Sequence, residues 1–448
     1  MSVVVVGGGI SGLVAARTLE AAGEEVILLE RTERLGGKIV THKIRDAVIE
    51  GGPDWFITRV PEALELCRAL GIEARLVSPA GSGALLVRRG ILRPFPRGFV
   101  RGIPPSARAV LRSRFVSPFG ALRSLGDYLL PGPLTGPDIS IGALVRRRFG
   151  EQVLDRLVEP MLAASRSGAP DEISLAAGAP EIDAAARSSR SVMRALRRQA
   201  GEPPMLPPFL GVRGGMERVV HALSDGLERT QVMLLSEVAT IERTGSGWRV
   251  RLASGTRVEA RAVVIAAPAP AAAVMLRASA PGPADGLETI RYEPAAVVGL
   301  VYPTGSAPPP EGATGIVVPA SERKSVTACA WFSSKWPHVS GPEGPDIVRA
   351  FVGGDAALAR DEGALVDEVS AEIAGLTGAP GTPDDHVVTR WRHALPVLRV
   401  GHFELIDAVE AALPPGIALA GAALRGSGLP DCIRSGAAAA AAVAGTER

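Results

Sequence analysis

Aromatic residues, cysteines and long apolar segments are all scarce in this sequence. Phe, Trp and Tyr together make up 4% of its 448 residues, whereas apolar residues as a whole make up 46%. Its three cysteines, Cys67, Cys329 and Cys432, form no Cys-x-x-Cys motif, so we expect no metal site, and their odd number fits a reducing cytoplasm. The longest apolar stretch, residues 262–276, contains two prolines and is too short to cross a bilayer, and a strand predicted from residue 2 leaves no room for a targeting segment. We therefore expect a protein of two or three domains that does not span a membrane.

Neither sign of charge dominates the whole chain, but one stretch is strongly basic. The formal net charge is +2, and we expect no nucleic-acid partner. Residues 79–150, in contrast, contain twelve arginines and no lysine, against the two acids Asp127 and Asp138. Such a stretch can attract an anionic substrate, face an anionic membrane or a protein partner, or form an ordinary solvated surface. The composition alone leaves these three interpretations open.

The first thirty residues have the pattern of a dinucleotide-binding unit. A β-branched run at residues 2–6 predicts a buried strand, a glycine turn follows at Gly7–Gly12, and an apolar helical pattern comes next. A second apolar run ends at Glu30. Glycines let the backbone approach a diphosphate, the helix N-terminus attracts its negative charge, and the acid accepts hydrogen bonds from ribose hydroxyls. This order and spacing favour a dinucleotide site over a chance glycine turn.

Two further glycine pairs favour FAD over a nicotinamide cofactor. Residues 34–38 read Arg-Leu-Gly-Gly-Lys shortly after the acid, and Gly51–Gly52 follow another short strand. A second glycine segment beside the first would let the chain wrap an extended diphosphate and ribityl chain, and Lys38 would supply a positive charge to phosphate or flavin atoms. This arrangement resembles the FAD-containing amine oxidase superfamily. A surface ion pair is the alternative for Arg34.

Residues 421–432 repeat the order of strand, glycine loop and helix far along the chain. The N-terminus of that helix would point towards an anionic group, which in a flavoenzyme is the reduced pyrimidine side of the ring. An ordinary helix cap is the alternative. No Ser-His-Asp set or pair of carboxylates stands out, and the six histidines are scattered, so we assign no catalytic acid or base.

Changes in composition divide the chain into one domain that is interrupted twice. The predicted fold class is α/β (α+β overall), with a Rossmann-like FAD-binding domain of the amine oxidase type formed by residues 1–75, 205–276 and 386–448. Residues 76–204 are predicted to form an arginine-rich, mostly helical domain that faces the substrate or a membrane. Residues 277–385 are predicted to form a mixed-sheet substrate domain. The sequence shows no internal repeat.

Over essentially its whole length, the sequence resembles the FAD-dependent porphyrinogen oxidases of haem synthesis, and most of all the bacterial branch that forms coproporphyrin III. Two of the shared segments, GGGISGL and RLGGKI, are common to the superfamily. The more telling segments are PRGFVRGIP (96–104) and GSGLPDCI (426–433). The resemblance also rests on EGGPDWF (50–56), RRRFGEQVLDRLVEPML (146–162), GVRGGMERVVHAL (211–223) and RWRHALP (390–396).

The resemblance implies a noncovalent FAD and residues that hold it. The implied contacts with the diphosphate and ribose come from Gly7, Gly8, Gly9, Ile10, Ser11, Gly12, Glu30 and Arg31. Those with the flavin, and with adenine through the backbone of Val238, come from Arg34, Lys38, Gly52, Pro53, Asp54, Trp55, Val238, Trp391, Gly421, Ser427, Gly428 and Leu429. Without the resemblance, core packing is the alternative for Trp391 and Val238.

The family's reaction is implied with the cofactor. Three two-electron steps oxidise a porphyrinogen to a porphyrin, with hydride transfer to FAD and with oxygen as the acceptor that yields hydrogen peroxide. A substrate with four carboxylates would suit the arginine-rich stretch, and the candidate substrate residues are Arg88, Arg89 and Arg166. We expect a cytoplasmic enzyme, with peripheral contact to the inner face of the membrane or to another haem-pathway enzyme left open.

The substrate half departs from the family pattern at three places. Residues 82–86 lack the usual polar or basic residue and its Tyr, Arg166 replaces an aromatic residue, and Leu398 replaces a Tyr. Three alternatives therefore stay open: a protoporphyrinogen IX oxidase, an amine oxidase or desaturase, and a non-catalytic flavin or tetrapyrrole carrier. Amine oxidation is disfavoured because residues 421–428 contain neither an aromatic residue nor a cysteine.

Overall fold

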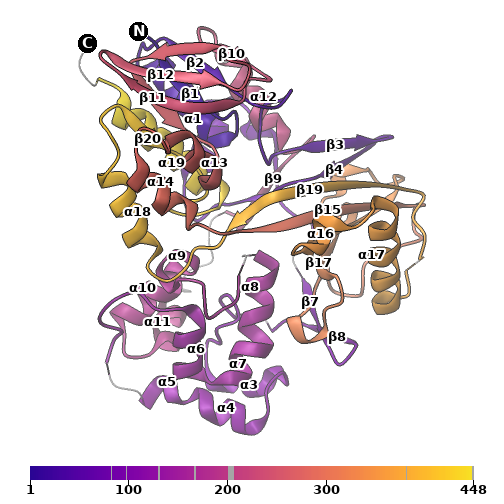
Figure 1. Ribbon diagram of the computed structural model, residues 1–448. Coiled ribbons are helices and arrows are strands. Elements are labelled where there is room, and N and C mark those ends of the chain that lie inside the picture. The colour runs from indigo at the N-terminus through magenta and orange to yellow at the C-terminus, as the bar shows by residue number, and fades with distance from the viewer. Residues whose placement is uncertain are drawn as a thin grey trace.

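The computed structural model describes residues 1–81, 83–96, 98–129, 132–165, 168–199, 206–379 and 381–445. Figure 1 shows three regions: one at the top built around a parallel sheet, a large second sheet towards the right, and a group of helices at the bottom. The two ends of the chain both lie in the first region. The predicted α/β fold, in which a Rossmann-like domain is interrupted by a helical and a mixed-sheet region, is confirmed.

The first region is centred on a five-stranded sheet whose order is β10-β2-β1-β14-β20. Every pairing in it is parallel. Its strands are β1 (Val3–Val6), β2 (Val26–Leu29), β10 (Gln231–Met233), β14 (Ala262–Ile265) and β20 (Ile417–Leu419). Short apolar runs rich in Val and Ile form such strands because both faces of a parallel sheet are covered. The sheet joins three distant segments of the chain.

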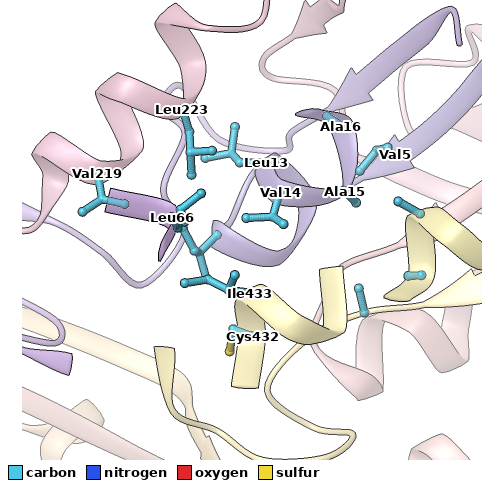
Figure 2. Close-up of a cluster of buried hydrophobic side chains, with 14 of the residues drawn as sticks. Val5, Leu13, Val14, Ala15, Ala16, Leu66, Val219, Leu223, Cys432 and Ile433 are labelled. Atoms are coloured by element: carbon cyan, nitrogen blue, oxygen red, sulfur yellow. The ribbon is translucent and has the colours of Figure 1, made fainter. Parts of the chain in front are cut away.

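Alternate residues of β1 face two cores on opposite sides of this sheet. Val3 and Val5 belong to one core, and Val4 and Val6 to the other. The first core contains α1 (Ile10–Ala21), α2 (Glu62–Ala69), α12 (Glu217–Asp225) and α19 (Leu429–Val443). Figure 2 shows part of this core, with the side chains of Leu13, Val14, Leu66, Leu223 and Ile433. The second contains the antiparallel strands β11 (Val238–Thr244), β12 (Gly247–Leu252) and β13 (Arg257–Ala260), with helices α13 (Ala269–Leu276), α14 (Pro281–Glu288) and α18 (His402–Ala411).

The second sheet has seven strands in the order β19-β15-β18-β17-β16-β7-β8. All pairings are antiparallel except that of β16 with β7. The strands are β7 (Ala84–Arg88), β8 (Ile91–Pro94), β15 (Tyr292–Tyr302), β16 (Gly315–Val317), β17 (Val326–Trp331), β18 (Asp346–Gly353) and β19 (Asp385–Pro396). One face of the sheet packs against α17 (Glu362–Thr377), and short helices lie at α15 (Phe332–Lys335) and α16 (Ala356–Ala359).

Strand pairing divides the chain differently from the predicted domain ranges at two places. The hairpin β7–β8 comes from the range predicted as helical, yet it pairs with β16 in the second sheet. Strand β19 comes almost entirely from the range predicted for the cofactor domain, yet it pairs with β15 in that same sheet. Both differences have the same cause: a strand joins the sheet that offers it free backbone groups, and the partner can lie hundreds of residues away.

The helical region has its own core, and it contains all helices from α3 to α11. These are α3 (Ala107–Ser113), α4 (Pro118–Ser124), α5 (Gly126–Leu129), α6 (Ile141–Phe149), α7 (Glu151–Val153), a π-helical turn (Leu154–Val158), α8 (Glu159–Ser165), α9 (Leu175–Gly178), α10 (Pro180–Ser188) and α11 (Val192–Gln199). Serine side chains cap α3, α4, α6 and α9 by accepting hydrogen bonds from first-turn amides. The fully buried Asp127 does the same for α11, where it accepts from the backbone N–H groups of Val192 and Met193.

Short strands connect the three regions. They are β3 (Thr41–Ile44), β4 (Ala47–Glu50), β5 (Phe56–Ile57), β6 (Leu76–Val77) and β9 (Phe209–Val212), and 3₁₀ turns lie at Glu73–Arg75, Ala320–Glu322 and Pro337–Val339. Strand β9 pairs with both β5 and β6. In the part of the chain that the structure describes, no helix has the length and apolar character needed to cross a membrane.

Candidate functional site

The turn after β1 needs glycine at two positions where the backbone is strained or closely approached. Gly7 has a φ of +105°, and a Cβ added to Gly12 would lie 1.8 Å from the carbonyl oxygen of Gly7. Gly9 caps α1, no side chain caps the first turn, and that turn contains no acidic residue. The first turn of α1 therefore carries no acidic side chain of its own, which suits its amides to a diphosphate.

A second glycine loop lies directly against the first. The N–H of Gly36 donates to the carbonyl of Gly8 at 2.8 Å, and Gly9 and Gly36 form an isolated parallel bridge. A Cβ added to Gly37 would lie 3.1 Å from the Cα of Gly9. The predicted meeting of the two glycine segments is thus present, and it forms a cradle that side chains would fill.

The acid at the end of β2 is buried and fixed by the glycine turn. One oxygen of Glu30 accepts from the N–H of Gly8 at 2.7 Å. Its other oxygen accepts from the N–H and the hydroxyl of Thr32 at 2.9 and 2.8 Å. Next to it, Arg31 is exposed. The carboxylate thus lies beside the first glycine turn, where the ribose of a bound dinucleotide would approach it.

Arg34 shapes the second glycine loop. Its guanidinium donates to the carbonyl oxygens of Leu35, Gly37 and Ile39 at 3.0, 2.5 and 3.0 Å. These bonds hold the glycine pair against the first turn. The structure thus gives Arg34 a supporting position, which differs both from the direct cofactor contact predicted for it and from a surface ion pair.

Lys38 lies in a mainly apolar and aromatic environment. Its ammonium is 5.4 Å from the centroid of the Tyr292 ring, and burial lowers its pKa to about 8. The hydroxyl of Tyr292 accepts from the N–H of Ala269, and its ring meets that of His393 edge-on at 5.4 Å. A cation placed in this way gains most from an anionic ligand that balances its charge.

Residues 52–55 form the third glycine segment, and they are anchored to the second sheet. A Cβ added to Gly52 would lie 1.8 Å from the carbonyl oxygen of Lys38, and Pro53 follows it. The Asp54 carboxylate accepts from Lys335 at 2.7 Å, from the indole of Trp336 at 2.9 Å and from Arg349 at 3.0 Å. Burial alone would raise the pKa of Asp54, but Lys335 and Arg349 lower it to about 2.

Asp54 and Trp55 therefore contact protein groups in this structure. Arg349 is buried, and besides Asp54 it donates to the carbonyl of Gly52. The ring of Trp55 packs on Phe209 with the centroids 4.5 Å apart. Both residues were predicted to lie along the flavin, and that stays a prediction; the contacts of Asp54 direct its carboxylate towards Lys335 and Arg349.

Trp391 and Val238 mark two other sides of the site. The indole N–H of Trp391, on β19, donates to the carbonyl of Gly51 at 2.7 Å. Val238 is buried at the start of β11, where it pairs with Leu252. The second sheet thus contacts the third glycine segment through Trp391. The β11–β12–β13 sheet, which contains Val238, follows the segment that bonds to Glu30 at the end of β2.

Residues 421–428 form the C-terminal glycine turn, between β20 and α19. Gly421 has a φ of +129° and donates through its N–H to the hydroxyl of Ser435. Gly428 caps α19, which begins at Leu429, and its N–H donates to Asp431 at 3.1 Å. The hydroxyl of Ser11, in α1, donates to the carbonyl of Cys432 at 2.9 Å. The start of α19 therefore lies beside α1. Ser427 lies between Gly426 and Gly428 of the C-terminal glycine turn.

The candidate substrate arginines lie apart from this cluster. Arg88 donates to the carbonyl of Arg114 and lies 5.9 Å from the ring of Phe115. Arg89, with a φ of +52°, is exposed at the tip of the β7–β8 hairpin. Strand β7 is five strand positions away from β19, a separation of about 24 Å at the usual spacing. Arg166 lies outside the described residues.

Many arginines of the basic stretch have partners within the protein. Arg123 donates to the carbonyls of Arg146 and Arg147 at the end of α6, and Arg146 pairs with Glu151 and Asp171. Arg148 is buried and lies 3.8 Å from Asp127. The composition of the stretch therefore overstates the positive charge that is free to meet a ligand.

Three residues that matter to the site were missed from the sequence. Arg349 and Lys335 hold Asp54, but no local motif marks them. His402 donates from Nε2 to the carbonyls of Ala423 and Leu424, at 2.9 and 3.0 Å, in the C-terminal glycine turn. Its position in the Gly-His pair after β19 was a usable signal. No group of acids, histidines and cysteines suited to a metal ion occurs among the described residues.

The parallel sheet, its glycine turn, the buried acid and the second glycine loop define a dinucleotide-binding flavoprotein. The chain belongs to the family described as flavin containing amine oxidoreductase, which it matches over residues 10–444. It is an FAD-dependent oxidoreductase, and FAD is its cofactor.

Relatives match the chain over nearly its whole length. It is 33% identical to the coproporphyrinogen III oxidase of Bacillus subtilis (strain 168), over 98% of this chain and 96% of that protein. It is 31% identical to the coproporphyrinogen III oxidase of Propionibacterium freudenreichii subsp. freudenreichii, over 96% of this chain and 88% of that protein. A crystal structure of a protein from Exiguobacterium sp. 255-15 is also similar, with a TM-score of 0.90 and 30% identity over 100% of this chain and 99% of that one.

Proposed function

We propose that the protein catalyses the oxygen-dependent, six-electron oxidation of coproporphyrinogen III to coproporphyrin III in haem biosynthesis. The observation that carries the proposal is the 33% identity to the Bacillus subtilis coproporphyrinogen III oxidase, which extends over 98% of the chain. In balance, the macrocycle loses six electrons and six protons, and three O₂ become three H₂O₂. FAD held by the glycine segments and Glu30 would supply a two-electron hydride acceptor for each of the three oxidations.

The chain's own groups bind and orient the cofactor in this proposal. Gly7–Gly12 and the Gly36–Gly37 loop leave backbone amides and space for the diphosphate, and Glu30 takes the ribose. Lys38 provides a positive charge. FAD is held noncovalently in this proposal, and burial raises the pKa of the Cys432 thiol to about 11, which keeps this cysteine a weak nucleophile near neutral pH.

A direct test compares substrates that differ in carboxylate number. We expect the purified protein to show a flavin spectrum and, under air, to convert coproporphyrinogen III to a fluorescent porphyrin faster than protoporphyrinogen IX, with three peroxides per porphyrin. Faster oxidation of protoporphyrinogen IX would favour that substrate instead. A yellow protein that is inert to both would contradict the proposal and favour a carrier or another oxidoreductase.

The contribution of the exposed basic hairpin is tested separately. Arg88 has structural partners, so its removal would disturb the hairpin, whereas Arg89 is exposed. If this tip attracts the anionic substrate, Arg89→Gln raises the KM for coproporphyrinogen III at low salt and leaves kcat unchanged, and added salt removes the difference. An unchanged KM at low salt would place Arg89 outside the path of the substrate.

We also propose peripheral contact with an anionic membrane, based on one surface of the helical region. Leu111, Phe119, Leu122 and Leu129 are exposed to 53, 82, 62 and 77%. They lie on α3, α4 and α5, which Figure 1 shows together at the bottom of the molecule. Arg108, Arg112 and Arg114 are exposed on or beside α3. Protruding apolar side chains among arginines suit a surface of acidic lipids.

Vesicle binding distinguishes this surface from an ordinary solvated one. We expect the protein to sediment with vesicles containing phosphatidylglycerol and not with pure phosphatidylcholine vesicles. Phe119→Ser/Leu122→Ser should weaken this binding, whereas Val274→Ser, at a 66% exposed site on α13, should not. Equal binding of all three proteins, or none, would contradict the proposal.

A further inference from the structure

His402 is buried at the start of α18 and binds the C-terminal glycine turn. It is 3% exposed, and its Nε2 lies 2.9 Å from the carbonyl oxygen of Ala423 and 3.0 Å from that of Leu424. Both partners only accept hydrogen bonds, so Nε2 carries the proton and donates to both. One side chain thus fixes two successive carbonyls just before Gly426.

The next residue of the turn is also held from α18. Arg425 donates to Asp407 at 2.6 Å and to Glu410 at 2.5 Å, and its guanidinium lies 5.8 Å from the ring of Phe403. Residues 423–425 of the turn are therefore held by α18, whereas Gly421 and Gly428 bond to α19. Because α19 begins at Leu429, the position of α18 also affects where the N-terminus of α19 lies.

The start of α18 is also bound to the helical region. The N–H of Gly401 donates to Asp138 at 3.1 Å, and the other oxygen of Asp138 accepts from the N–H of Ala176 in α9 at 3.3 Å. Ahead of it, the N–H of Ser174 donates to the carbonyl of Leu398 at 2.8 Å. Arg399 pairs with Glu172 at 3.1 Å. Figure 1 shows this junction, with α9 just below α18.

We propose that His402 is a positioning residue that transmits the docking of the helical region, through Asp138 and α18, to the turn that faces the flavin. The proposal rests on FAD binding at the proposed site with its pyrimidine side at residues 426–429. The proposal does not depend on which substrate the enzyme oxidises. The N-terminus of α19 carries partial positive charge, so a well-seated turn stabilises the anionic reduced flavin.

The experiment measures the midpoint potential of bound FAD by spectroelectrochemistry in the purified holoenzyme. We expect His402→Phe, which fills the space without donating, to lower the potential and to alter the flavin absorption bands. Asp138→Ala should lower it in the same direction, and the double variant should add little to either change because both act in one chain of contacts. Glu404→Gln, on the same helix, is the matched control and should keep the wild-type potential.

Several results would overturn the inference. One is a wild-type potential in both single variants, and another is additive effects in the double variant. Should His402→Phe retain too little FAD, His402→Leu, which also lacks a donor, is measured instead, and a wild-type potential with partial FAD loss would show a purely structural role. The measurement reports only the flavin potential. A result against the role of His402 therefore leaves the proposed oxidation of coproporphyrinogen III standing, and failure to oxidise that substrate leaves the role of His402 standing.

Discussion

Gly12 stands where the first turn of α1 crosses the backbone of Gly7. A methyl group there would lie 1.8 Å from a carbonyl oxygen, so Gly12→Ala must push the helix away from the glycine turn. Overpacking of this kind costs about 1–3 kcal/mol, which corresponds to a loss of FAD affinity of about 5- to 150-fold. Titration of the apoprotein with FAD, followed by flavin fluorescence, measures this change.

Gly375→Ala is the control for that substitution. Gly375 is exposed within α17, and an added Cβ would meet nothing within 4 Å. Alanine is the better helix former, so this variant should keep the wild-type FAD affinity and gain up to about 1 kcal/mol of stability. A Gly12→Ala protein with wild-type affinity would contradict the role given to the close approach.

Glu50 makes the stability of the protein depend on pH near neutrality. It is 3% exposed, it accepts from the N–H of Met216 and the hydroxyl of Thr41, and burial raises its pKa to about 7. Between pH 4.5 and 7 the folded state therefore binds more protons than the unfolded state, and the free energy of unfolding falls as pH rises.

Glu50→Gln should remove this dependence. From pH 5 to pH 8, the wild type should lose up to about 3 kcal/mol more stability than the variant, in which the same site never ionises. Urea unfolding of both proteins at the two pH values gives the comparison, and all other groups cancel in the difference. Parallel pH profiles would show that Glu50 ionises in the folded state as it does in the unfolded one.

At the scale of elements, the ion cluster around Asp54 ties a cofactor segment to β18. Arg349 is 1% exposed, and its loss would leave part of a buried carboxylate unpaired, so Arg349→Met should cost about 3–5 kcal/mol. Arg249 on β12 pairs with Glu259 on β13, and both side chains are over a third exposed. Arg249→Met should therefore lower the free energy of unfolding by no more than about 1 kcal/mol. Denaturant unfolding compares the two.

The sign of the pH effect at Asp54 is opposite to that at Glu50. Its pKa of about 2 in the folded state lies below the unfolded value of 3.8. Its contribution to stability is therefore complete above pH 4 and is lost as the pH falls towards 2. For the two arginine variants, equal losses in the free energy of unfolding would mean that the buried ion cluster does not anchor residues 52–55 to β18.

Elements whose partners are close in sequence could be predicted, and those with distant partners could not. The strand, glycine turn, helix and second strand up to Glu30 are neighbours in the chain, so their pattern is complete within thirty residues. The β7–β8 hairpin was also readable, but its pairing with β16 depends on residues over 200 positions away. The same distance explains why the partners of the Asp54 carboxylate were not predicted, since Lys335 and Arg349 carry no local motif.

At the scale of the whole molecule, α1 and α19 form one unit from opposite ends of the sequence. A Cβ added to Gly436 would lie 2.2 Å from the carbonyl oxygen of Ser11. Gly436→Val should therefore separate the two helices, lower the Tm and weaken FAD binding. Ala438→Val, at an exposed site of the same helix, changes mainly the helix propensity and should cost about 0.5 kcal/mol. Thermal unfolding with and without FAD tests the pair, and similar effects of both variants would contradict the close packing.

The general location of the cofactor could be predicted from the sequence, but the arrangement of its supports could not. Glycines mark positions where the backbone approaches a ligand or another backbone segment closely, and a short stretch of sequence is enough to show them. Arg34, by contrast, contacts three carbonyls of its own loop, and His402 contacts a turn twenty residues further on. Such contacts depend on how whole helices and strands pack, so no local sequence motif predicts them.

The bond from Ser11 to Cys432 joins residues 421 positions apart. During translation, the glycine turn of β1 is therefore made about 400 residues before α19, the helix that packs against α1. A nascent chain therefore carries half of a flavin site for most of its synthesis. If the proposed flavin site is right, a chain that ends before α19 lacks one side of it, and we expect such a chain to bind no flavin.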